Sequence, residues 1–177
     1  MPYEIERRVN LWLEDRLPSE AKLERVYGGR DYYFTSSSPF LRVRDMKLTY
    51  QCGLNLTCPQ SIQRQGKKSI DKEGWVRETE KTVDASEALR ALNERFGKPK
   101  VILEGCRREF SLGDLSVCSD YVMNLGYWTE IEKVTKSRSE NSQALKKVIE
   151  AFSFMGVGKG QLVEDIYPVL LLKKTTR

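Results

Sequence analysis

Charged residues recur at every second position in four separate stretches of this chain, and this spacing limits what the chain can fold into. The four pairs are Glu4 and Glu6, Arg42 and Arg44, Glu78 and Glu80, and Glu130 and Glu132. Because residues two apart in a β-strand point to the same face, each pair shares one face of its strand. Two arrangements stay open on spacing alone. In the first, the sheet is open and its charged faces are exposed to water. In the second, the sheet closes into a barrel, and the enclosed charges are paired with one another or bind a ligand.

The first stretch, residues 3–11, combines acidic and basic groups on one strand. Its apolar residues, from Tyr3 to Leu11, share one face, whereas Glu4, Glu6 and Arg8 share the other. Carboxylate oxygens suit Mg²⁺ or Mn²⁺, and an arginine fork suits phosphate oxygens. The alternative is a half-exposed edge strand whose charged face is solvated.

The chain contains no histidine, which removes the commonest general base and every Ser-His or Cys-His pair. Its four cysteines form no Cys-x-x-Cys pair, so we expect buried or free thiols rather than a zinc site. Any chemistry must therefore use carboxylates, lysine, arginine, tyrosine and a hard metal ion.

The length of 177 residues predicts one domain over residues 1–177. No apolar run reaches the roughly 18 residues that a membrane span needs, and the charged start predicts no secretory signal, so we expect a cytoplasmic protein. The net charge of +5 favours anionic partners such as nucleotides or polyphosphate. Nucleic acid is disfavoured, because the basic group at residues 64–68 has no interleaved aromatic residues.

Alternation and turn residues predict the elements along the chain. Strands are expected at residues 3–11, 31–34, 40–45, 75–83, 100–110, 115–122 and 124–134, with residues 47–52 as the hairpin partner of 40–45. Helices are expected at residues 20–27, 85–96 and 139–155. Residues 53–74 are interpreted as a long loop, and residues 166–172 as an apolar tail that packs on the rest.

Several of these stretches resemble the CYTH superfamily of triphosphate tunnel metalloenzymes. Glu4-x-Glu6-x-Arg8 is similar to the family's Glu-x-Glu-x-Lys, and Leu41-Arg-Val-Arg44 to its Leu-Arg-x-Arg strand. Residues 77–80 resemble its acidic strand. The most specific match is Asp120-x-Val-x-x-Leu-Gly-x-Trp-x-Glu-Ile-Glu132. The resemblance covers residues 3 to about 172. Within the superfamily, the chain looks most like the class IV adenylyl cyclase branch.

The resemblance implies an α+β fold: a closed antiparallel β-barrel of about eight strands around a charged tunnel, with helices packed outside. The metal ligands for Mg²⁺ or Mn²⁺ would be Glu4, Glu6, Asp120, Glu130 and Glu132. The residues that bind the triphosphate would be Arg8, Arg42, Arg44, Arg77 and Arg108. Glu78, Glu80 and Arg107 would be catalytic, the carboxylates by orienting the nucleophile and Arg107 by offsetting charge on the leaving phosphate.

The chain departs from the family pattern on the basic side. Gln51 and Gly105 stand where the family has lysine, and Arg8 replaces a third lysine while keeping its charge. Three functions therefore stay open: an adenylate cyclase that forms cyclic AMP and pyrophosphate from ATP, a phosphohydrolase of tripolyphosphate, thiamine triphosphate or a nucleoside triphosphate, and a triphosphate-binding module without turnover. The oligomeric state, monomer or homodimer, also stays open.

Overall fold

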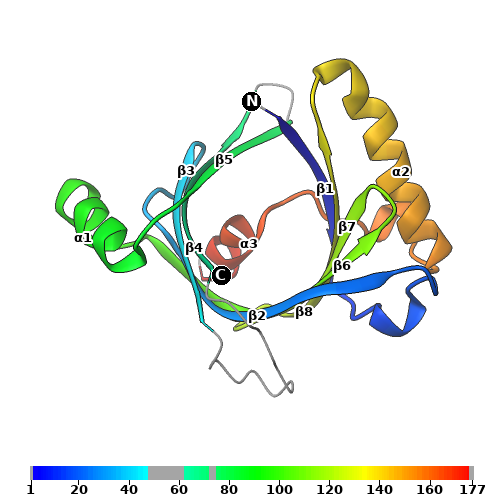
Figure 1. Ribbon diagram of the computed structural model, residues 1–177, viewed down its shortest axis with the longest axis horizontal. Coiled ribbons are helices and arrows are strands. Elements are labelled where there is room, and N and C mark those ends of the chain that lie inside the picture. The colour runs from blue at the N-terminus through cyan, green and yellow to red at the C-terminus, as the bar shows by residue number, and fades with distance from the viewer. Residues whose placement is uncertain (1, 48–61, 72–74, 176–177) are drawn as a thin grey trace.

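The fold is a closed barrel of eight antiparallel strands in the order β1-β5-β4-β3-β2-β6-β7-β8. It is seen in a computed structural model that describes residues 2–47, 62–71 and 75–175. Figure 1 looks into this barrel. The strands are β1 (Tyr3–Val9), β2 (Lys22–Tyr33), β3 (Phe40–Lys47), β4 (Ile62–Ile70), β5 (Val76–Thr82), β6 (Val101–Leu112), β7 (Leu115–Val122) and β8 (Gly126–Thr135). The predicted closed barrel is confirmed.

Alternation along each strand sorts apolar side chains outward and charged side chains inward. On β1, Tyr3, Ile5 and Val9 are buried against outer elements, whereas Glu6 and Arg8 are buried inside the barrel. β3 follows the same rule, because Val43 packs against a helix outside while its neighbours in sequence face the interior. A closed barrel has no open sheet edge. The charged side chains that point inward are therefore enclosed by the barrel rather than exposed on an open sheet.

The register between strands brings the sequence motifs together. β1 and β8 pair so that Glu6 lies opposite Glu132 and Arg8 opposite Glu130. β6 and β7 pair so that Arg107 lies opposite Asp120. The metal-ligand candidates from the two ends of the chain therefore share one wall of the barrel.

Three α-helices of the described chain pack around the barrel: α1 (Ala85–Phe96), α2 (Asn141–Phe154) and α3 (Tyr167–Thr175). α1 begins after Asp84, whose side chain accepts a hydrogen bond from the Glu87 N–H, and it covers β3. α2 covers β1 and β8 with an apolar stripe that includes Val148 and Phe152. Short 3₁₀ turns lie at Glu14–Arg16, Arg138–Glu140 and Lys159–Gln161.

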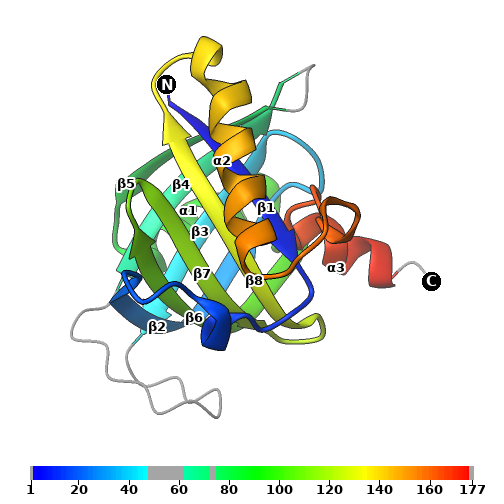
Figure 2. The ribbon, with the colours of Figure 1, turned by 90° about the vertical axis from the view of Figure 1, so that its right-hand side faces the viewer.

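The third helix closes one end of the barrel. Ile166 and Tyr167, at the start of α3, pack in one apolar cluster with residues from the ends of several strands. These are Tyr33, Phe40, Val101, Val122 and Trp128. In Figure 2 α3 lies beyond one side of the barrel, and in Figure 1 it is seen through the barrel at the far end. The apolar tail predicted at residues 166–172 is thus mostly helical and closes one end of the barrel.

Three sequence-based expectations are wrong in the described residues. Residues 20–27 are not a helix, because residues 22–33 form the strand β2, which pairs with β6 along its length. The loop predicted at residues 53–74 contains the strand β4 over residues 62–70. β4 is also the strand that follows and pairs with β3, in place of residues 47–52, of which Lys47 ends β3 and the remainder lies outside the described residues.

Two further sequence expectations concern cysteine and the membrane. Cys118 is a buried free thiol, as expected, but Cys106 is disulfide-bonded, which corrects the expectation of free thiols there. Among the described helices, none has the length and apolar content to cross a bilayer.

Candidate functional site

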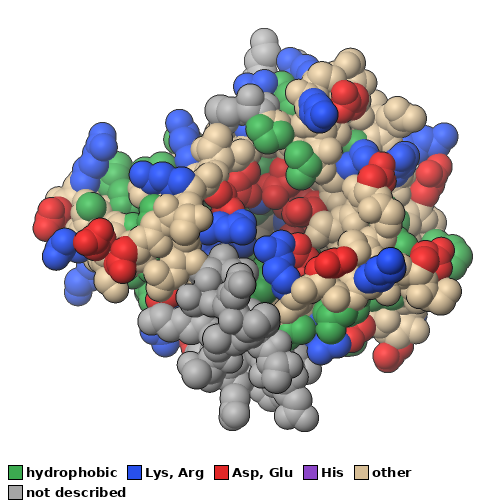
Figure 3. Space-filling view, viewed as in Figure 1, with side chains coloured by type: hydrophobic (Ala, Val, Ile, Leu, Met, Phe, Trp, Pro, Cys, Tyr) green, Lys and Arg blue, Asp and Glu red, His purple; other side chains and the backbone are tan. Residues whose placement is uncertain are grey.

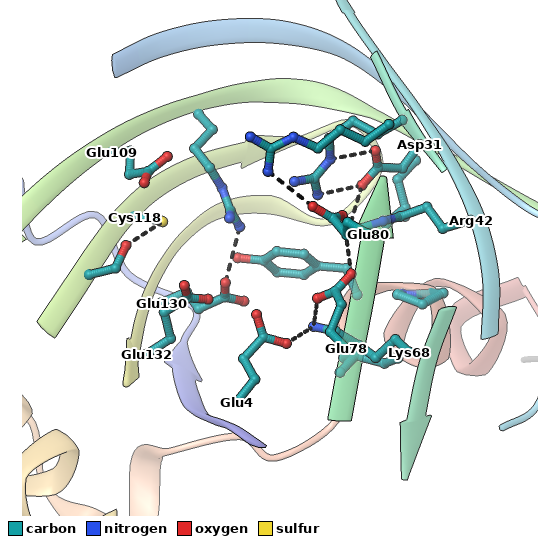
Figure 4. Close-up of a pocket in the computed structure, with 18 of the residues that line it drawn as sticks. Glu4, Asp31, Arg42, Lys68, Glu78, Glu80, Glu109, Cys118, Glu130 and Glu132 are labelled. Atoms are coloured by element: carbon teal, nitrogen blue, oxygen red, sulfur yellow. Dashed lines mark hydrogen bonds and ion pairs between the residues drawn. The ribbon is translucent and has the colours of Figure 1, made fainter. Parts of the chain in front are cut away.

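The barrel encloses a cavity of about 140 Å³ whose walls are mostly charged. Figure 3 shows acidic and basic side chains gathered in a hollow at the centre of the molecule. Acids come mainly from β1, β5 and β8, and bases from β3, β4 and β6. Figure 4 shows these side chains pointing toward one another across the interior. Inward alternation on eight strands is what concentrates so many charges in so small a space.

Three carboxylates form an acidic centre at the cavity wall: Glu4 and Glu132 line the cavity, and Glu6 is buried beside them. Glu4, Glu6 and Glu132 each offer one oxygen, and these oxygens lie within 4.8 Å of one another. Burial raises the pKa of Glu4 well above its usual value, opposed by Lys68 and reinforced by Glu6 and Glu132. Burial and the charge of Glu130 raise the pKa of Glu132 to about 7. These three carboxylates, which we call the acidic trio, repel one another, so a cation bound among them would be stabilised.

The acidic trio fits a hard divalent cation by the chemistry of its buried oxygens. Within the described chain, Glu4 Oε2 and Glu6 Oε1 are buried and accept no hydrogen bond of normal geometry. Positive groups do lie near: Lys68 Nζ is 2.7 Å from Glu4 Oε2, and Arg8 Nη2 is 3.0 Å from Glu6 Oε1. Carboxylate oxygens are the ligands that Mg²⁺ and Mn²⁺ prefer. The donor set therefore matches the metal that the sequence predicts.

Lys68 is a site residue that sequence reasoning missed. Its ammonium lies 2.7 Å from Glu4, 3.3 Å from Glu6 and 3.4 Å from Glu78, so it contacts two members of the acidic trio. Burial alone would lower the pKa of Lys68, but Glu4, Glu6 and Glu78 raise it well above its usual value. One sequence signal could have identified Lys68. Arg64, Gly66 and Lys68 lie at every second position, as on one face of a strand, in a stretch that was interpreted as a loop.

The basic wall is built from β3 and β4 and is already paired with carboxylates. Arg42 contacts Glu78 and Glu80. Arg44 donates two hydrogen bonds to Asp31, at 2.8 and 2.7 Å, and Arg64 lies 3.0 Å from Glu80. Asp31 and Arg64 were not predicted as site residues.

Glu78 and Glu80, the predicted nucleophile-orienting carboxylates, lie inside the cavity beside the basic wall. Burial alone would raise the pKa of Glu78, but Lys68 and Arg42 lower it far below its usual value. Glu78 therefore stays ionised and acts as a hydrogen-bond acceptor rather than as a proton acceptor near neutral pH.

Arg107 links the two remaining acids that the sequence assigned to the metal. It donates to both oxygens of Asp120 at 2.7 Å and to Glu130 at 3.1 Å. The Tyr167 hydroxyl also donates to Asp120, at 2.7 Å. Burial alone would raise the pKa of Glu130, but Arg8 and Arg107 lower it to about 2. Asp120 and Glu130 are thus paired with bases and stand apart from the acidic trio.

Two predicted triphosphate ligands lie outside the cavity, which corrects their placement. Arg77 donates to the Tyr3 hydroxyl, and its guanidinium carbon lies 4.3 Å from the centre of the Tyr3 ring. Arg108 lies 2.9 Å from Glu14. Each is adjacent in sequence to an inward residue, Glu78 or Arg107, so strand alternation turns it outward.

The two positions that depart from the family pattern differ in what the structure says of them. Gly105 faces Tyr121 so closely that a Cβ atom there would lie 2.1 Å from the Tyr121 carbonyl oxygen. A side chain is therefore excluded at this point of β6 unless the backbone moves. Gln51 lies outside the described residues.

Comparisons with known proteins identify the fold. No protein-family model matches the chain, and no curated protein is found to be similar to it. Two solved proteins of Pyrococcus horikoshii superpose with TM-scores of 0.77 and 0.76 at 21% and 22% identity. The first match covers 97% of this chain and 99% of the other, and the second covers 93% and 97%. A Vibrio parahaemolyticus protein described as a "putative adenylate cyclase" superposes with a TM-score of 0.74 at 14% identity, covering 96% of this chain and 98% of that one. The chain therefore shares, over nearly its whole length, the closed-barrel fold that the resemblance implied.

Proposed function

We propose that this protein binds a divalent cation and a triphosphate in its barrel and acts on ATP as a class IV adenylate cyclase-like enzyme. The observation that carries the proposal is the acidic trio, two of whose members face a wall of arginine and lysine across one small cavity. A metal–triphosphate complex has both positive and negative charge, so it complements both walls at once. The fold shared with the Vibrio protein supports the same class.

The acidic trio would hold Mg²⁺ or Mn²⁺. The ion would supply Lewis-acid polarisation of phosphate oxygens. Glu130 and Asp120, which pair with Arg8, Arg107 and Tyr167, would orient the bases around the ligand. Burial and the charge of Glu130 raise the pKa of Glu132 to about 7, so a bound cation would displace a proton from Glu132 near neutral pH.

The triphosphate would bind to bases that now contact carboxylates. Arg42, Arg44 and Arg107 each form charge-assisted hydrogen bonds, and phosphate oxygens accept from a guanidinium in the same bidentate geometry. Arg64 and Lys68 add positive charge from β4. Catalysis would then depend mainly on positioning and on electrostatic stabilisation of the leaving phosphate.

The cyclase reaction needs no reactant besides ATP. The ribose 3′-oxygen forms a bond to the α-phosphorus, the bond from the α-phosphorus to the bridging oxygen breaks, and pyrophosphate leaves with that electron pair. The proton of the 3′-hydroxyl passes to water or to pyrophosphate. Glu78 and Glu80, which both accept from Arg42, would orient the hydroxyl.

Triphosphate hydrolysis is the second candidate, and the size of the cavity favours it. About 140 Å³ is below the roughly 300–1,000 Å³ of pockets that enclose a drug-sized ligand. The phosphate chain therefore fits inside better than a whole nucleotide does. Hydrolysis needs only the phosphate chain and a water molecule in the cavity.

Product identification separates these reactions. The protein is incubated with Mn²⁺ and either ATP or tripolyphosphate, and the products are identified by phosphorus NMR. Cyclic AMP with pyrophosphate supports the cyclase, and orthophosphate from either substrate supports the phosphohydrolase. Absence of both product formation and triphosphate binding would refute the proposal.

The variant Glu6→Gln tests the metal-dependent step. We expect it to reduce turnover by at least about 100-fold, because it removes a charged oxygen donor from the acidic trio. Glu104→Gln is the matched control, since Glu104 pairs with Arg30 on the outer surface at 2.8 Å. Wild-type turnover in Glu6→Gln would remove Glu6 from the metal site.

A further inference from the structure

Arg8 is among the most deeply buried side chains of the described chain, with 1% of its surface exposed. Its Nε and Nη2 donate to Glu130 Oε2 at 3.0 and 2.6 Å. Nη2 also lies 3.0 Å from Glu6 Oε1, and Nη1 donates to the backbone carbonyl of Asp165. Each of its three nitrogens therefore has a protein partner, one of them a backbone carbonyl. Its side chain is also less exposed, at 1%, than those of Arg42, Arg44 and Arg107, at 7%, 14% and 17%, so its guanidinium is poorly placed to bind a phosphate.

The same residue fastens the C-terminal segment to the first strand. The backbone of Arg8 pairs with Val163 in both directions, with N···O distances of 3.2 and 2.7 Å. The guanidinium then contacts Asp165, and its carbon lies 4.9 Å from the centre of the Tyr167 ring. Arg8 thus touches residues 163, 165 and 167, which lead into α3.

This C-terminal segment forms the floor of the cavity. Ile166, Tyr167 and Pro168 line the cavity, and Ile166 and Tyr167 pack against the ends of five strands. The Tyr167 hydroxyl donates to Asp120, which also holds Arg107. One face of Arg8 therefore supports the acidic trio through Glu6, and the other supports the floor.

The geometry points to Arg8 as a positioning residue that fixes both Glu6 and the C-terminal floor, rather than as a ligand of the triphosphate. Lysine could not perform both tasks, because its single ammonium lacks the spread of donors that reaches two carboxylates and a carbonyl at once. Arginine at this position, where the resembling family has lysine, is then explained by the floor. The metal-binding part of this inference rests on the proposed function.

The test compares Arg8→Lys with Arg7→Lys. Arg7 is the adjacent residue on the same strand and also reaches the C-terminal segment, through Glu164 at 2.9 Å, but from the outside. We expect Arg8→Lys to speed amide hydrogen exchange in residues 163–172 by at least about tenfold, because hydrogen bonds to a charged group are lost. Arg7→Lys should leave this exchange unchanged.

Metal binding gives an independent readout by calorimetric titration with Mn²⁺. Because Glu6 loses its orienting partner, Arg8→Lys should bind Mn²⁺ about tenfold more weakly. Its affinity for the preformed Mn²⁺–tripolyphosphate complex, measured at saturating Mn²⁺, should stay within about twofold of wild type, since lysine keeps the charge and no direct phosphate contact is lost.

Two results would overturn the proposal. One is wild-type hydrogen exchange and Mn²⁺ affinity in Arg8→Lys; the other is a loss confined to the affinity for the Mn²⁺–tripolyphosphate complex, which would make Arg8 a phosphate ligand. If wild type itself binds neither probe, the proposed function fails, while hydrogen exchange still judges the role of Arg8 in holding the floor.

A second variant covers the case in which Arg8→Lys does not fold. Tyr167→Phe removes the hydroxyl that bonds Asp120 and keeps the ring beside Arg8. Because every contact of Arg8 is kept, this variant should speed exchange in residues 163–172 by less than about threefold. Exchange accelerated about tenfold or more in Tyr167→Phe would show that Arg8 does not hold the floor and would overturn the proposal.

Discussion

Glu132 differs from the other carboxylates of the cavity because it forms no ion pair with a described residue, although bases lie nearby. Burial and the neighbouring Glu130 raise the pKa of Glu132 to about 7 from its usual 4.5. The folded, metal-free protein therefore holds a proton between these values that the unfolded chain releases. Its contribution to stability is present at pH 5 and is lost as pH rises toward about 7 and above.

The variant Glu132→Gln isolates this contribution. In metal-free buffer, the free energy of unfolding of wild type should fall between pH 5 and pH 8 relative to that of Glu132→Gln, by at most about 3 kcal/mol. Urea unfolding at pH 5, 6, 7 and 8 measures the difference. Parallel pH profiles for the two proteins would mean that folding does not raise the pKa of Glu132.

Sequence reasoning was most successful where a charged pair alternates with apolar residues. Glu4 and Glu6 alternate with Tyr3 and Ile5, and this pattern predicted the strand and the face that the two charges share, but not whether that face points inward. Lys68 could not be placed in the same way, because its neighbours Lys67 and Ser69 are polar too. Strands that face a charged interior and water have no apolar face to identify them.

At the scale of elements, the sequence predicted only the end of β2, as a strand at residues 31–34, and did not predict β4. Residues 20–25 contain good helix formers such as Ala21, Leu23 and Glu24, yet residues 22–33 extend because β6 offers a long pairing partner. Tertiary pairing overrides local propensity here. The inward spacing of Arg25, Tyr27 and Asp31, visible afterwards, could not be separated from a helix without knowing that partner.

The pairing of β6 with β7 makes a specific prediction about Gly105. Because a Cβ atom would lie 2.1 Å from the Tyr121 carbonyl oxygen, Gly105→Ala should destabilise the protein by about 1–3 kcal/mol, as overpacking does. For the same reason, Gly105→Lys should not simply restore the lysine of the family pattern. Urea unfolding measures the first effect, and triphosphate binding measures the second.

Gly158→Ala is the matched control for this prediction. Gly158 lies in a loop with φ of −74°, and its added Cβ would meet Gln161 Oε1 at an ordinary 3.5 Å. Its free energy of unfolding should stay within about 0.5 kcal/mol of wild type. If Gly105→Ala were as stable as Gly158→Ala, the two strands would have to separate easily at this point.

At the scale of the molecule, barrel closure explains why the charges can be buried at all. The recurrence of charged pairs left an open sheet and a closed barrel equally possible, and the resemblance to a tunnel family favoured the barrel. Neither source could say which acid pairs with which base. That pattern follows from register, which for example places Lys68 opposite Glu78 and Arg107 opposite Asp120, and register depends on all eight strands closing together.

The ammonium group of Lys68 is the cation that contacts the acidic trio in the metal-free protein, so it should compete with a metal ion for the same carboxylates. Its ammonium contacts Glu4 and Glu6, and a divalent ion bound there must displace it. We therefore expect Lys68→Met to bind Mn²⁺ about tenfold more tightly than wild type, because no ammonium has to be displaced. Without metal, the same variant should be less stable by about 3–5 kcal/mol, the usual cost of breaking a buried ion pair.

Arg64→Met provides the comparison, since Arg64 comes from the same strand and contacts Glu80 but no member of the acidic trio. It removes one positive charge from the cavity and should change Mn²⁺ affinity by less than about threefold, because the effect of a more distant charge is weaker. Calorimetric titration with Mn²⁺ and thermal unfolding with and without the ion measure both quantities. If Lys68→Met binds Mn²⁺ no more tightly than Arg64→Met does, the ammonium does not compete with the ion for the acidic trio.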